Sequence, residues 1–289
     1  MKKLAFIGGG NMAEALARGL VAGKVFAPAD LIVAEVDPGR RRKLGRALKI
    51  ETTADNLAAL RAARAVLFAV KPQNIDDVLG EIRAAIAPGE TRAARGKGAS
   101  GPAPIAAESR LFISIAAGIT LARFTAALGP RARVIRVMPN APAMVGEGMA
   151  ALAKSPGATR ADLNFALRIF RAVGDAVALD DETPLDAVTA LSGSGPAYVY
   201  LFVKALADAG AAEGLEPALA LRMALRTLRG AAETMRRSPL SAAELIRVVA
   251  SPGGTTEAAL RKFAERGFSA IVNEALHAAA QRSRELGRG

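Results

Sequence analysis

Residues 2–20 read KKLAFIGGGNMAEALARGL, which is a short apolar run, a glycine turn and a stretch rich in Ala and Leu. This order predicts a strand, a tight turn and a helix, the first βα unit of a dinucleotide-binding fold. Gly8 permits the tight turn, Gly10 lets a pyrophosphate reach the backbone, and Ala13 lets the helix pack closely on the strand. A strand before the glycines and a helix after them favour a nicotinamide-type cofactor over a purely structural turn.

The second predicted strand, residues 31–34, ends at Glu35, where the acid that binds the ribose is expected. A carboxylate there accepts hydrogen bonds from the ribose hydroxyls of NADH and repels the 2′-phosphate of NADPH. Arg40, Arg41 and Arg42 follow, and any of them can neutralise that phosphate. We therefore predict NADPH or NADH as the cofactor, with NADH used at least as well as NADPH.

The pattern of apolar runs indicates two regions of different architecture. Up to about residue 180, short apolar runs alternate with helical stretches, which predicts a mostly parallel sheet with right-handed crossovers. Besides the two strands above, these runs are residues 65–70, 111–115, 134–137 and 176–179. From Thr183 onward no strand pattern remains. We predict an α/β fold, with a Rossmann-type dinucleotide-binding domain over residues 1–180 and an all-α dimerisation and substrate domain over residues 181–289.

The C-terminal region is predicted to consist of helices rich in Ala and Leu. Residues 197–211 place apolar side chains along one stripe of a helix, and Pro217 opens the next helix. The stripe comprises Tyr198, Leu201, Phe202, Ala205, Leu206 and Ala209. Tyr198 thus has two interpretations, core packing or a hydrogen bond to a substrate. Such helices have no sheet to lie on and pack against one another or a partner chain, so we predict at least a homodimer.

The composition excludes several classes of partner and site. The net charge is +12, but the basic residues are scattered and aromatic residues make up only 4%, so we expect no nucleic-acid partner. There is no Cys for a disulfide or a zinc site, and no run approaches the ~18 apolar residues that span a bilayer. The only histidine, His277, lies among Ala and Leu, and the acidic residues 180–182 lack calcium-loop spacing and read as a solvated turn. We expect a soluble cytoplasmic protein with no metal site and no membrane partner.

Residues 88–104 interrupt the alternation of strands and helices. They are rich in Gly, Pro, Ala and Arg and show no periodicity, which predicts a surface loop. The loop is interpreted either as a tolerated insertion or as a lid or anion-binding arm.

Residues 251–256 read SPGGTT and stand between two helical stretches. The adjacent glycines let a ligand approach the backbone closely, and the threonines stand where a helix over residues 257–266 begins. A helix N-terminus has unpaired N–H groups and a partial positive charge, which suit a small carboxylate. A Thr hydroxyl there can also hydrogen-bond a ligand nitrogen. The alternative is a Gly-rich turn with a Thr N-cap.

Six motifs in a fixed order carry a resemblance to a known family. They are GGGNMA at residues 8–13, AVKPQ at 69–73, SIAAGIT at 114–120, RVMPN at 136–140, LSGSGPAY at 191–198 and SPGGTT at 251–256. Over essentially the whole chain they resemble pyrroline-5-carboxylate reductase, and the pairing of GSGPAY with SPGGTT is specific to that family. The resemblance implies NAD(P)H-dependent reduction of L-1-pyrroline-5-carboxylate to L-proline, the last step of proline biosynthesis. It also implies a homodimer with interleaved helices, often assembled into a decamer of five dimers.

The resemblance further implies roles for particular residues. The cofactor-binding residues would be Gly8, Gly9, Gly10, Asn11, Met12, Glu35, Asn56, Ala69, Val70, Lys71, Pro72, Ile115, Ala116 and Ala117. The substrate-binding residues would be Ser251, Gly253, Gly254, Thr255 and Thr256, with Thr256 the catalytic residue closest to the ring nitrogen. The chain departs from the family where Ala141 replaces the usual Thr, where Glu35 replaces a small polar residue, and where residues 91–106 look inserted.

The reduction of a cyclic imine requires few side chains. A protonated imine is already an electrophile, so the reaction needs a hydride donor, a fixed geometry and a group that steadies the ring nitrogen. No catalytic His is needed. Two alternatives remain: a dehydrogenase of a β-hydroxy acid or other small carbonyl compound, in which Lys71 orients the substrate, and a non-catalytic dinucleotide-binding protein. The dehydrogenase alternative offers no reason for the SPGGTT motif.

Overall fold

The computed structural model describes residues 1–86 and 109–288, and it divides the chain into two compact units. The first unit comprises Met1–Gly193 together with Ala280–Gly289, and the second comprises Ser194–Ala279. The domain boundary at residue 180 stays a prediction. The loop predicted over residues 88–104 lies outside the described residues.

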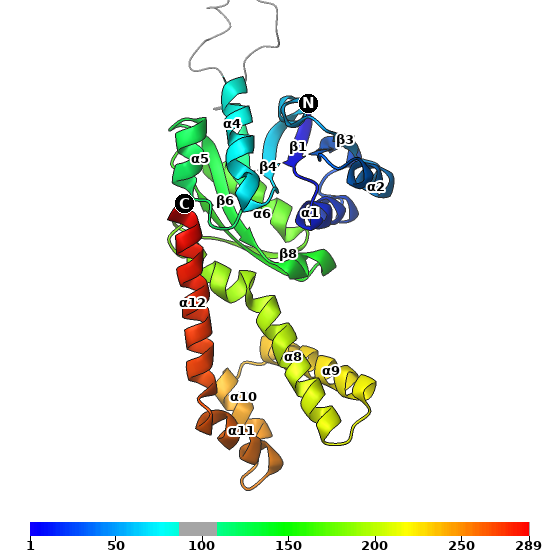
Figure 1. Ribbon diagram of the computed structural model, residues 1–289, viewed down its shortest axis with the longest axis vertical. Helices are drawn as coiled ribbons and strands as arrows, with labels where there is room; N and C mark the ends of the chain where they lie inside the picture. The colour runs from blue at the N-terminus through cyan, green and yellow to red at the C-terminus, as the bar shows by residue number, and fades with distance from the viewer. Residues whose placement is uncertain (87–108, 289) are drawn as a thin grey trace, which may run out of the picture. The chain divides into compact units, whose positions relative to one another are not determined.

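The first unit is built on one eight-stranded sheet (Figure 1). The first six strands are mutually parallel, β7 is antiparallel to β6, and β8 is parallel to β7. In the order β3-β2-β1-β4-β5-β6-β7-β8, the strands are β3 (Glu51–Thr53), β2 (Leu31–Ala34), β1 (Lys2–Ile7), β4 (Ala63–Phe68), β5 (Leu111–Ser114), β6 (Arg133–Pro139), β7 (Gly148–Lys154) and β8 (Gly174–Ala178). This mostly parallel sheet, with the strand order of a dinucleotide-binding fold over its first six strands, confirms the predicted fold class.

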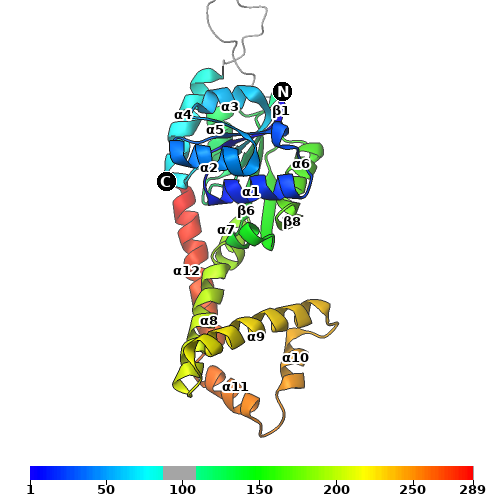
Figure 2. The same cartoon turned by 90° about the vertical axis from the view of Figure 1, so that its right-hand side faces the viewer.

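Helices cover both faces of this sheet (Figure 2). The longer ones are α1 (Asn11–Ala22), α2 (Pro38–Leu48), α3 (Asn56–Ala62), α4 (Ile75–Ala85), α5 (Leu121–Leu128) and α6 (Arg160–Arg171). Short helical turns are η1 (Pro28–Asp30), η2 (Pro72–Asn74), η4 (Ala141–Val145), α7 (Leu185–Val188) and η5 (Thr189–Gly193). Helices join the parallel strands because the chain must return to the opposite end of the sheet before the next parallel strand can begin.

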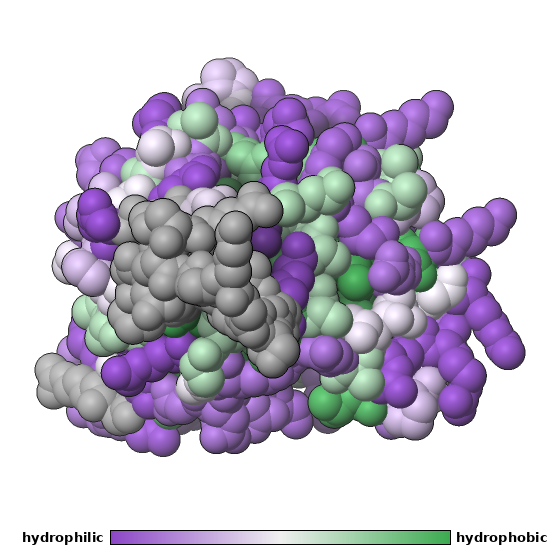
Figure 3. Space-filling view, turned by 90° about the horizontal axis from the view of Figure 1, so that it is seen from above, coloured by the Kyte–Doolittle hydropathy of each residue, from purple (hydrophilic) through white to green (hydrophobic). Residues whose placement is uncertain are grey.

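The alternation of side chains along each strand produces two hydrophobic cores. In β1, Leu4 and Phe6 face a core that includes residues of α1, α2 and α6. Ala5 and Ile7 face the opposite core, which includes residues of α3, α4 and α5. Both faces of the strand are therefore buried, as its continuous apolar run predicts. The outer face of the molecule seen in Figure 3 carries mostly hydrophilic residues, with hydrophobic ones in small separate patches.

The second unit contains helices only. They are α8 (Gly195–Ala212), α9 (Pro217–Arg237), α10 (Ala242–Val249), α11 (Thr255–Glu265) and the first part of α12 (Phe268–Arg288). α8 and α9 follow one another through a short connection and contact each other (Figure 2), and Pro217 opens α9 as predicted. No residue of this unit belongs to a hydrophobic core cluster of the described chain.

The predicted apolar stripe of α8 is not the face that the single chain buries. Val203 is the buried residue of α8, whereas Leu201 is 68% exposed and Leu206 is 38% exposed. α8 meets α9 through small residues, since a Cβ on Gly210 would lie 3.4 Å from the Cβ of Ala220. The prediction that these residues form a helix is confirmed. Their apolar side chains stay exposed in the single chain and require a further protein surface to cover them.

Candidate active site

The predicted cofactor residues lie along one edge of the sheet. The carboxyl ends of the parallel strands meet there, and the strand order reverses between β1 and β4, which marks the crevice where such sheets bind ligands. Gly8–Met12 follow β1, Ala69–Pro72 follow β4 and Ile115–Ala117 follow β5. Asn56 begins α3, and its Nδ2 donates to Glu81 at 2.8 Å. The structure thus brings these residues to the expected edge.

In the glycine turn after β1, the backbone conformation and the surrounding atoms require glycine at position 8 but not at position 10. Gly8 has φ +96°, and a Cβ there would lie 2.9 Å from the backbone N of Val70 and 3.0 Å from the carbonyl of Ala69. Gly10 has φ −65°, and the atom nearest to a Cβ there, the carbonyl oxygen of Ala69, is 3.9 Å away. Gly10 is also the N-cap of α1 and offers no side-chain acceptor to the first turn of the helix. Open space beside unpaired helix N–H groups fits a pyrophosphate.

Glu35 is held against this turn. Its Oε2 accepts a hydrogen bond from the Gly9 N–H at 2.8 Å, and its Oε1 accepts one from the Asp37 N–H at 3.0 Å. A Cβ on Gly9 would lie 3.1 Å from the Glu35 carboxylate. The carboxylate therefore faces the glycine turn, and its remaining lone pairs can accept hydrogen bonds from ribose hydroxyls.

The three arginines after β2 have different surroundings. Arg40 donates from Nη2 to Asn11 Oδ1 at 2.7 Å, which places its guanidinium beside the glycine turn. Arg41 donates from Nη1 to the carbonyl oxygens of Glu35 at 2.6 Å and Val36 at 2.9 Å, so it closes the turn after β2. Arg42 is exposed. The sequence did not distinguish the three, because the distinction depends on contacts across 29 residues of chain.

Of residues 180–182, which the sequence suggested to be a solvated turn, Glu182 departs from the prediction. Glu182 is half-buried and pairs at 2.7 Å with Arg136, whose side chain is buried in β6. The same carboxylate accepts the Leu121 N–H at the start of α5, at 3.0 Å. The solvated interpretation holds only for Asp180 and Asp181, which are exposed. Glu182 differs because a buried arginine needs a counter-charge.

Asn140, the last residue of the RVMPN motif, connects two further segments of the chain. Its Oδ1 accepts the Met149 N–H at 2.8 Å, and its Nδ2 donates to Ser192 Oγ at 3.1 Å. The amide thus ties the end of β6 to β7 and to the LSGSGPAY motif. One N–H and one lone pair of the amide are used in these contacts, which indicates a role in holding the two segments together.

The SPGGTT loop (residues 251–256) lies in the second unit. The Gly254 N–H donates to the Ser251 carbonyl at 3.0 Å, and Gly253 has φ +72°, the conformation that a turn with Pro before Gly requires. α11 begins at Thr255, two residues earlier than predicted, and its N-cap is Gly254, which has no side-chain acceptor. The alternative of a Thr N-cap is therefore wrong. The backbone N–H groups of the first turn and the hydroxyls of Thr255 and Thr256 remain available to a ligand.

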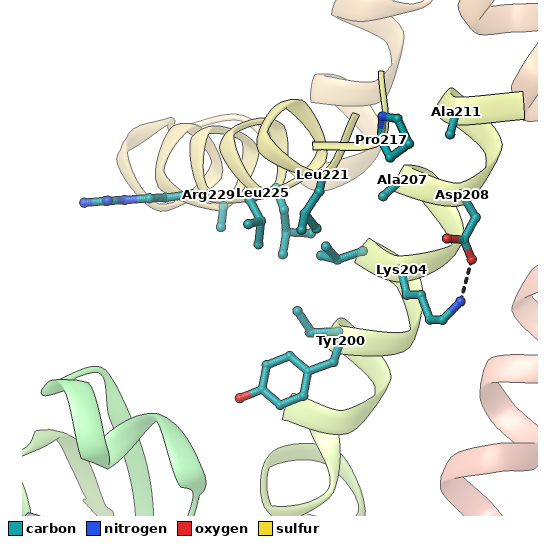
Figure 4. Close-up of a pocket in the computed structure, with 13 residues that line it drawn as sticks. Tyr200, Lys204, Ala207, Asp208, Ala211, Pro217, Leu221, Leu225 and Arg229 are labelled. Atoms are coloured by element: carbon teal, nitrogen blue, oxygen red, sulfur yellow. Dashed lines mark hydrogen bonds and ion pairs between the residues drawn. The ribbon is translucent and has the colours of Figure 1, made fainter. Parts of the chain in front are cut away.

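A groove of about 700 Å³ runs between α8 and α9 (Figure 4). Tyr200, Lys204 and Asp208 from α8 line it, opposite Leu221 and Leu225 from α9. Lys204 and Asp208 pair with each other at 2.6 Å, and most other lining residues are apolar. The groove therefore offers packing area rather than catalytic groups.

Other predicted residues have unremarkable surroundings. His277 lies exposed on α12, Lys71 is exposed before η2, and Tyr198 is half-buried. Within the described ranges, no cluster of three or more His, Asp or Glu residues is suited to a metal ion. In the same ranges, no helix combines the length and the apolar character that crossing a membrane requires.

Comparisons with known proteins identify the family. A model of the pyrroline-5-carboxylate reductase dimerisation domain matches residues 182–286, and a model described as NADP oxidoreductase, coenzyme F420-dependent, matches residues 3–91. The pyrroline-5-carboxylate reductase of Pseudomonas aeruginosa is 41% identical over 98% of this chain and 96% of its own. The solved structure of a pyrroline-5-carboxylate reductase from Coxiella burnetii is 32% identical and superposes with a TM-score of 0.85 over 99% of this chain and 98% of its own. That of Plasmodium falciparum pyrroline carboxylate reductase with NADP bound is 28% identical, with a TM-score of 0.83 over 99% and 98% of the two chains. On these similarities, and on the glycine turn and SPGGTT loop described above, the chain belongs to the pyrroline-5-carboxylate reductase family.

Proposed function

We propose that this protein reduces L-1-pyrroline-5-carboxylate to L-proline with NAD(P)H, as the last step of proline biosynthesis. The observation that carries the proposal is the start of α11, where a glycine N-cap leaves backbone N–H groups and two Thr hydroxyls available at the positive end of a helix. A small anionic imine presents the matching groups, a carboxylate and a ring nitrogen. The hydroxy acids of the alternative dehydrogenases have no ring nitrogen.

In this mechanism the protein binds and orients the substrate. The protonated imine is already an electrophile and needs no further activation. NAD(P)H, held by the glycine turn after β1, would supply the hydride that the imine carbon accepts, and the C=N π electrons would become the lone pair of the amine. The N–H groups of Thr255 and Thr256 would hold the substrate carboxylate, and the Thr256 hydroxyl would hold the ring nitrogen. Such positioning is worth up to about 7–11 kcal/mol of the barrier in favourable cases.

The test measures NAD(P)H oxidation at 340 nm with pyrroline-5-carboxylate as the substrate. In parallel, the reduction of NAD(P)+ is measured with a panel of β-hydroxy acids. Turnover of the imine alone supports the proposal. Turnover of a hydroxy acid alone would favour the dehydrogenase, and binding of the cofactor without any turnover would favour the non-catalytic protein.

For the choice of cofactor, we propose that NADH is used at least as well as NADPH. Support comes from Glu35, whose carboxylate faces the glycine turn and opposes a 2′-phosphate by like charge. Arg40 is the arginine placed to receive that phosphate, because its guanidinium already lies beside Asn11 of the turn. Arg41 is committed to the carbonyl oxygens after β2.

The proposed assembly is a homodimer, and a decamer of five dimers is the larger form that the resemblance implies. Support for the dimer comes from the second unit, in which Val248 is 71% exposed, Val249 is 68% exposed and Ile271 is 59% exposed. Exposed apolar side chains in this number mark an interaction surface. We also place the enzyme in the cytoplasm, as the sequence led us to expect, and fractionation of producing cells tests this.

A further inference from the structure

We infer that Glu257 is a positioning residue that holds the SPGGTT loop in the shape that receives the substrate. The inference rests on the proposed function, which makes this loop the substrate site. Glu257 itself is exposed. Its carboxylate Oε2 accepts a hydrogen bond from the Gly253 N–H at 2.6 Å.

The contact differs from the usual one made by a glutamate at this position of a helix. Counted from the N-cap Gly254, Glu257 is the third residue of α11. A glutamate there normally returns to the N–H of the N-cap itself. The Gly254 N–H is already engaged with the Ser251 carbonyl at 3.0 Å, and Glu257 reaches one residue further back, to Gly253. The side chain therefore links the turn to the first turn of the helix.

The loop needs such a link because its glycines give it many alternative conformations. Gly253 has φ +72°, and a Cβ on Gly254 would lie 2.5 Å from Ser251 Oγ, so side chains at these positions are disfavoured. Glycine loses more backbone freedom on ordering than other residues. The acceptor supplied by Glu257 offsets part of that loss before the substrate arrives, and the donors of Thr255 and Thr256 are then arranged in advance.

Glu244 provides a matched control within the same unit. It occupies the third position of α10, is half-buried whereas Glu257 is exposed, and accepts the Ser241 N–H at 2.7 Å. It makes the usual contact of a glutamate at this position, with the N–H of its own N-cap, and it lies outside the SPGGTT loop. A variant at Glu244 shows what loss of such a contact does to the protein in general.

The test compares Glu257→Ala, Glu257→Gln and Glu244→Ala in the full-length protein. Glu257→Ala should raise KM for pyrroline-5-carboxylate about tenfold, or about 1.4 kcal/mol, with kcat and the KM for NAD(P)H changed by less than about twofold. Glu257→Gln keeps an acceptor oxygen and should stay within about threefold of wild type. Glu244→Ala should leave KM unchanged.

Hydrogen exchange of the ligand-free protein gives a readout that does not depend on turnover. The amides of Ser251 and of residues 253–257 should exchange faster in Glu257→Ala than in wild type or Glu257→Gln. If wild type does not turn over pyrroline-5-carboxylate, the proposed function fails, while the exchange result still decides on Glu257. If wild type is active and Glu257→Ala changes neither KM nor exchange, or Glu244→Ala raises KM equally, the inference is wrong.

Discussion

Gly8→Ala should lower the stability of the fold, whereas Gly10→Ala should leave stability nearly unchanged and weaken the binding of the cofactor. In Gly8→Ala the new Cβ would lie 2.9 Å from the backbone N of Val70 and 3.0 Å from the carbonyl of Ala69. Both contacts are to backbone atoms at the end of a central strand, which cannot move aside like the tip of a side chain. In Gly10→Ala the nearest atom is 3.9 Å away, which is ordinary contact.

The magnitudes follow from these geometries. At Gly8, φ of +96° imposes about 1–2 kcal/mol on a residue with a Cβ, and forced packing adds about 1–3 kcal/mol. The sum, about 2–5 kcal/mol, is a large part of the 5–15 kcal/mol that stabilises a typical domain. At Gly10, φ is −65°, so Ala is tolerated and stability should change by less than about 1 kcal/mol. The methyl group there occupies the space assigned to the pyrophosphate, and KM for NAD(P)H should rise about tenfold or more.

Urea unfolding followed by circular dichroism measures the first effect, and steady-state kinetics with varied NAD(P)H measures the second. Gly8→Ala should lower the midpoint of unfolding, whereas Gly10→Ala should not. A Gly10→Ala enzyme with the cofactor KM of wild type would show that the pyrophosphate binds elsewhere. A Gly8→Ala protein as stable as wild type would show that the end of β4 yields to the methyl group.

Four further predictions concern the site, the cofactor, the fold and the assembly. Thr256→Ala should lower kcat/KM on pyrroline-5-carboxylate by about 1–3 kcal/mol, the worth of one well-placed hydrogen bond, and leave cofactor affinity nearly unchanged; wild-type kinetics would contradict its assignment. Glu35→Ser should shift the ratio of kcat/KM values toward NADPH and Arg40→Ala away from it, and ratios unchanged in both variants would refute the arrangement described for the two residues. Burial of Asp162 alone would raise its pKa, but hydrogen bonds from Arg133 and Thr159 outweigh burial and lower the pKa. Asp162→Asn should therefore cost about 1.5–3 kcal/mol of stability at pH 7. This difference from wild type should begin to shrink below about pH 4, where an Asp in the unfolded chain is protonated, and disappear as the pH falls through the lowered pKa of Asp162 in the folded protein. Light scattering should find at least a dimer, and an active monomer would remove the case for the homodimer.

The parts of the fold that the sequence predicted well depend on neighbours in the chain. The glycine turn after β1 and the proline at the start of α9 impose local backbone geometry, so they were located without knowledge of the rest. β3 and β7 were missed. β3 is three residues long, Glu-Thr-Thr, and none of them is buried. β7 reads GMAALAK, which lacks the β-branched and aromatic residues typical of strands, and its pairing with β6 decides its conformation.

The site divides in the same way. The positions of the glycine turn, of Glu35 and of the SPGGTT loop follow from spacing along the chain. The contact of Arg40 with Asn11 and the pairing of Glu182 with Arg136 depend on side chains that meet across long stretches of sequence. The contact between Glu257 and Gly253 is local, but its direction depends on a turn that already uses the expected donor, the Gly254 N–H.

The first unit is not continuous in the chain, and this has a consequence for biosynthesis. Residues from Ala280 onward belong to it: Ser283 donates to Asp186 at 2.6 Å, and a Cβ on Gly118 would lie 3.0 Å from the Cβ of Leu286. A ribosome therefore makes all of residues 194–279 before the last pieces of the first unit exist. Until then the first unit lacks this C-terminal segment, and the surface around Gly118 and Asp186 stays uncovered. During this interval the nascent chain is open to chaperones and to misassembly.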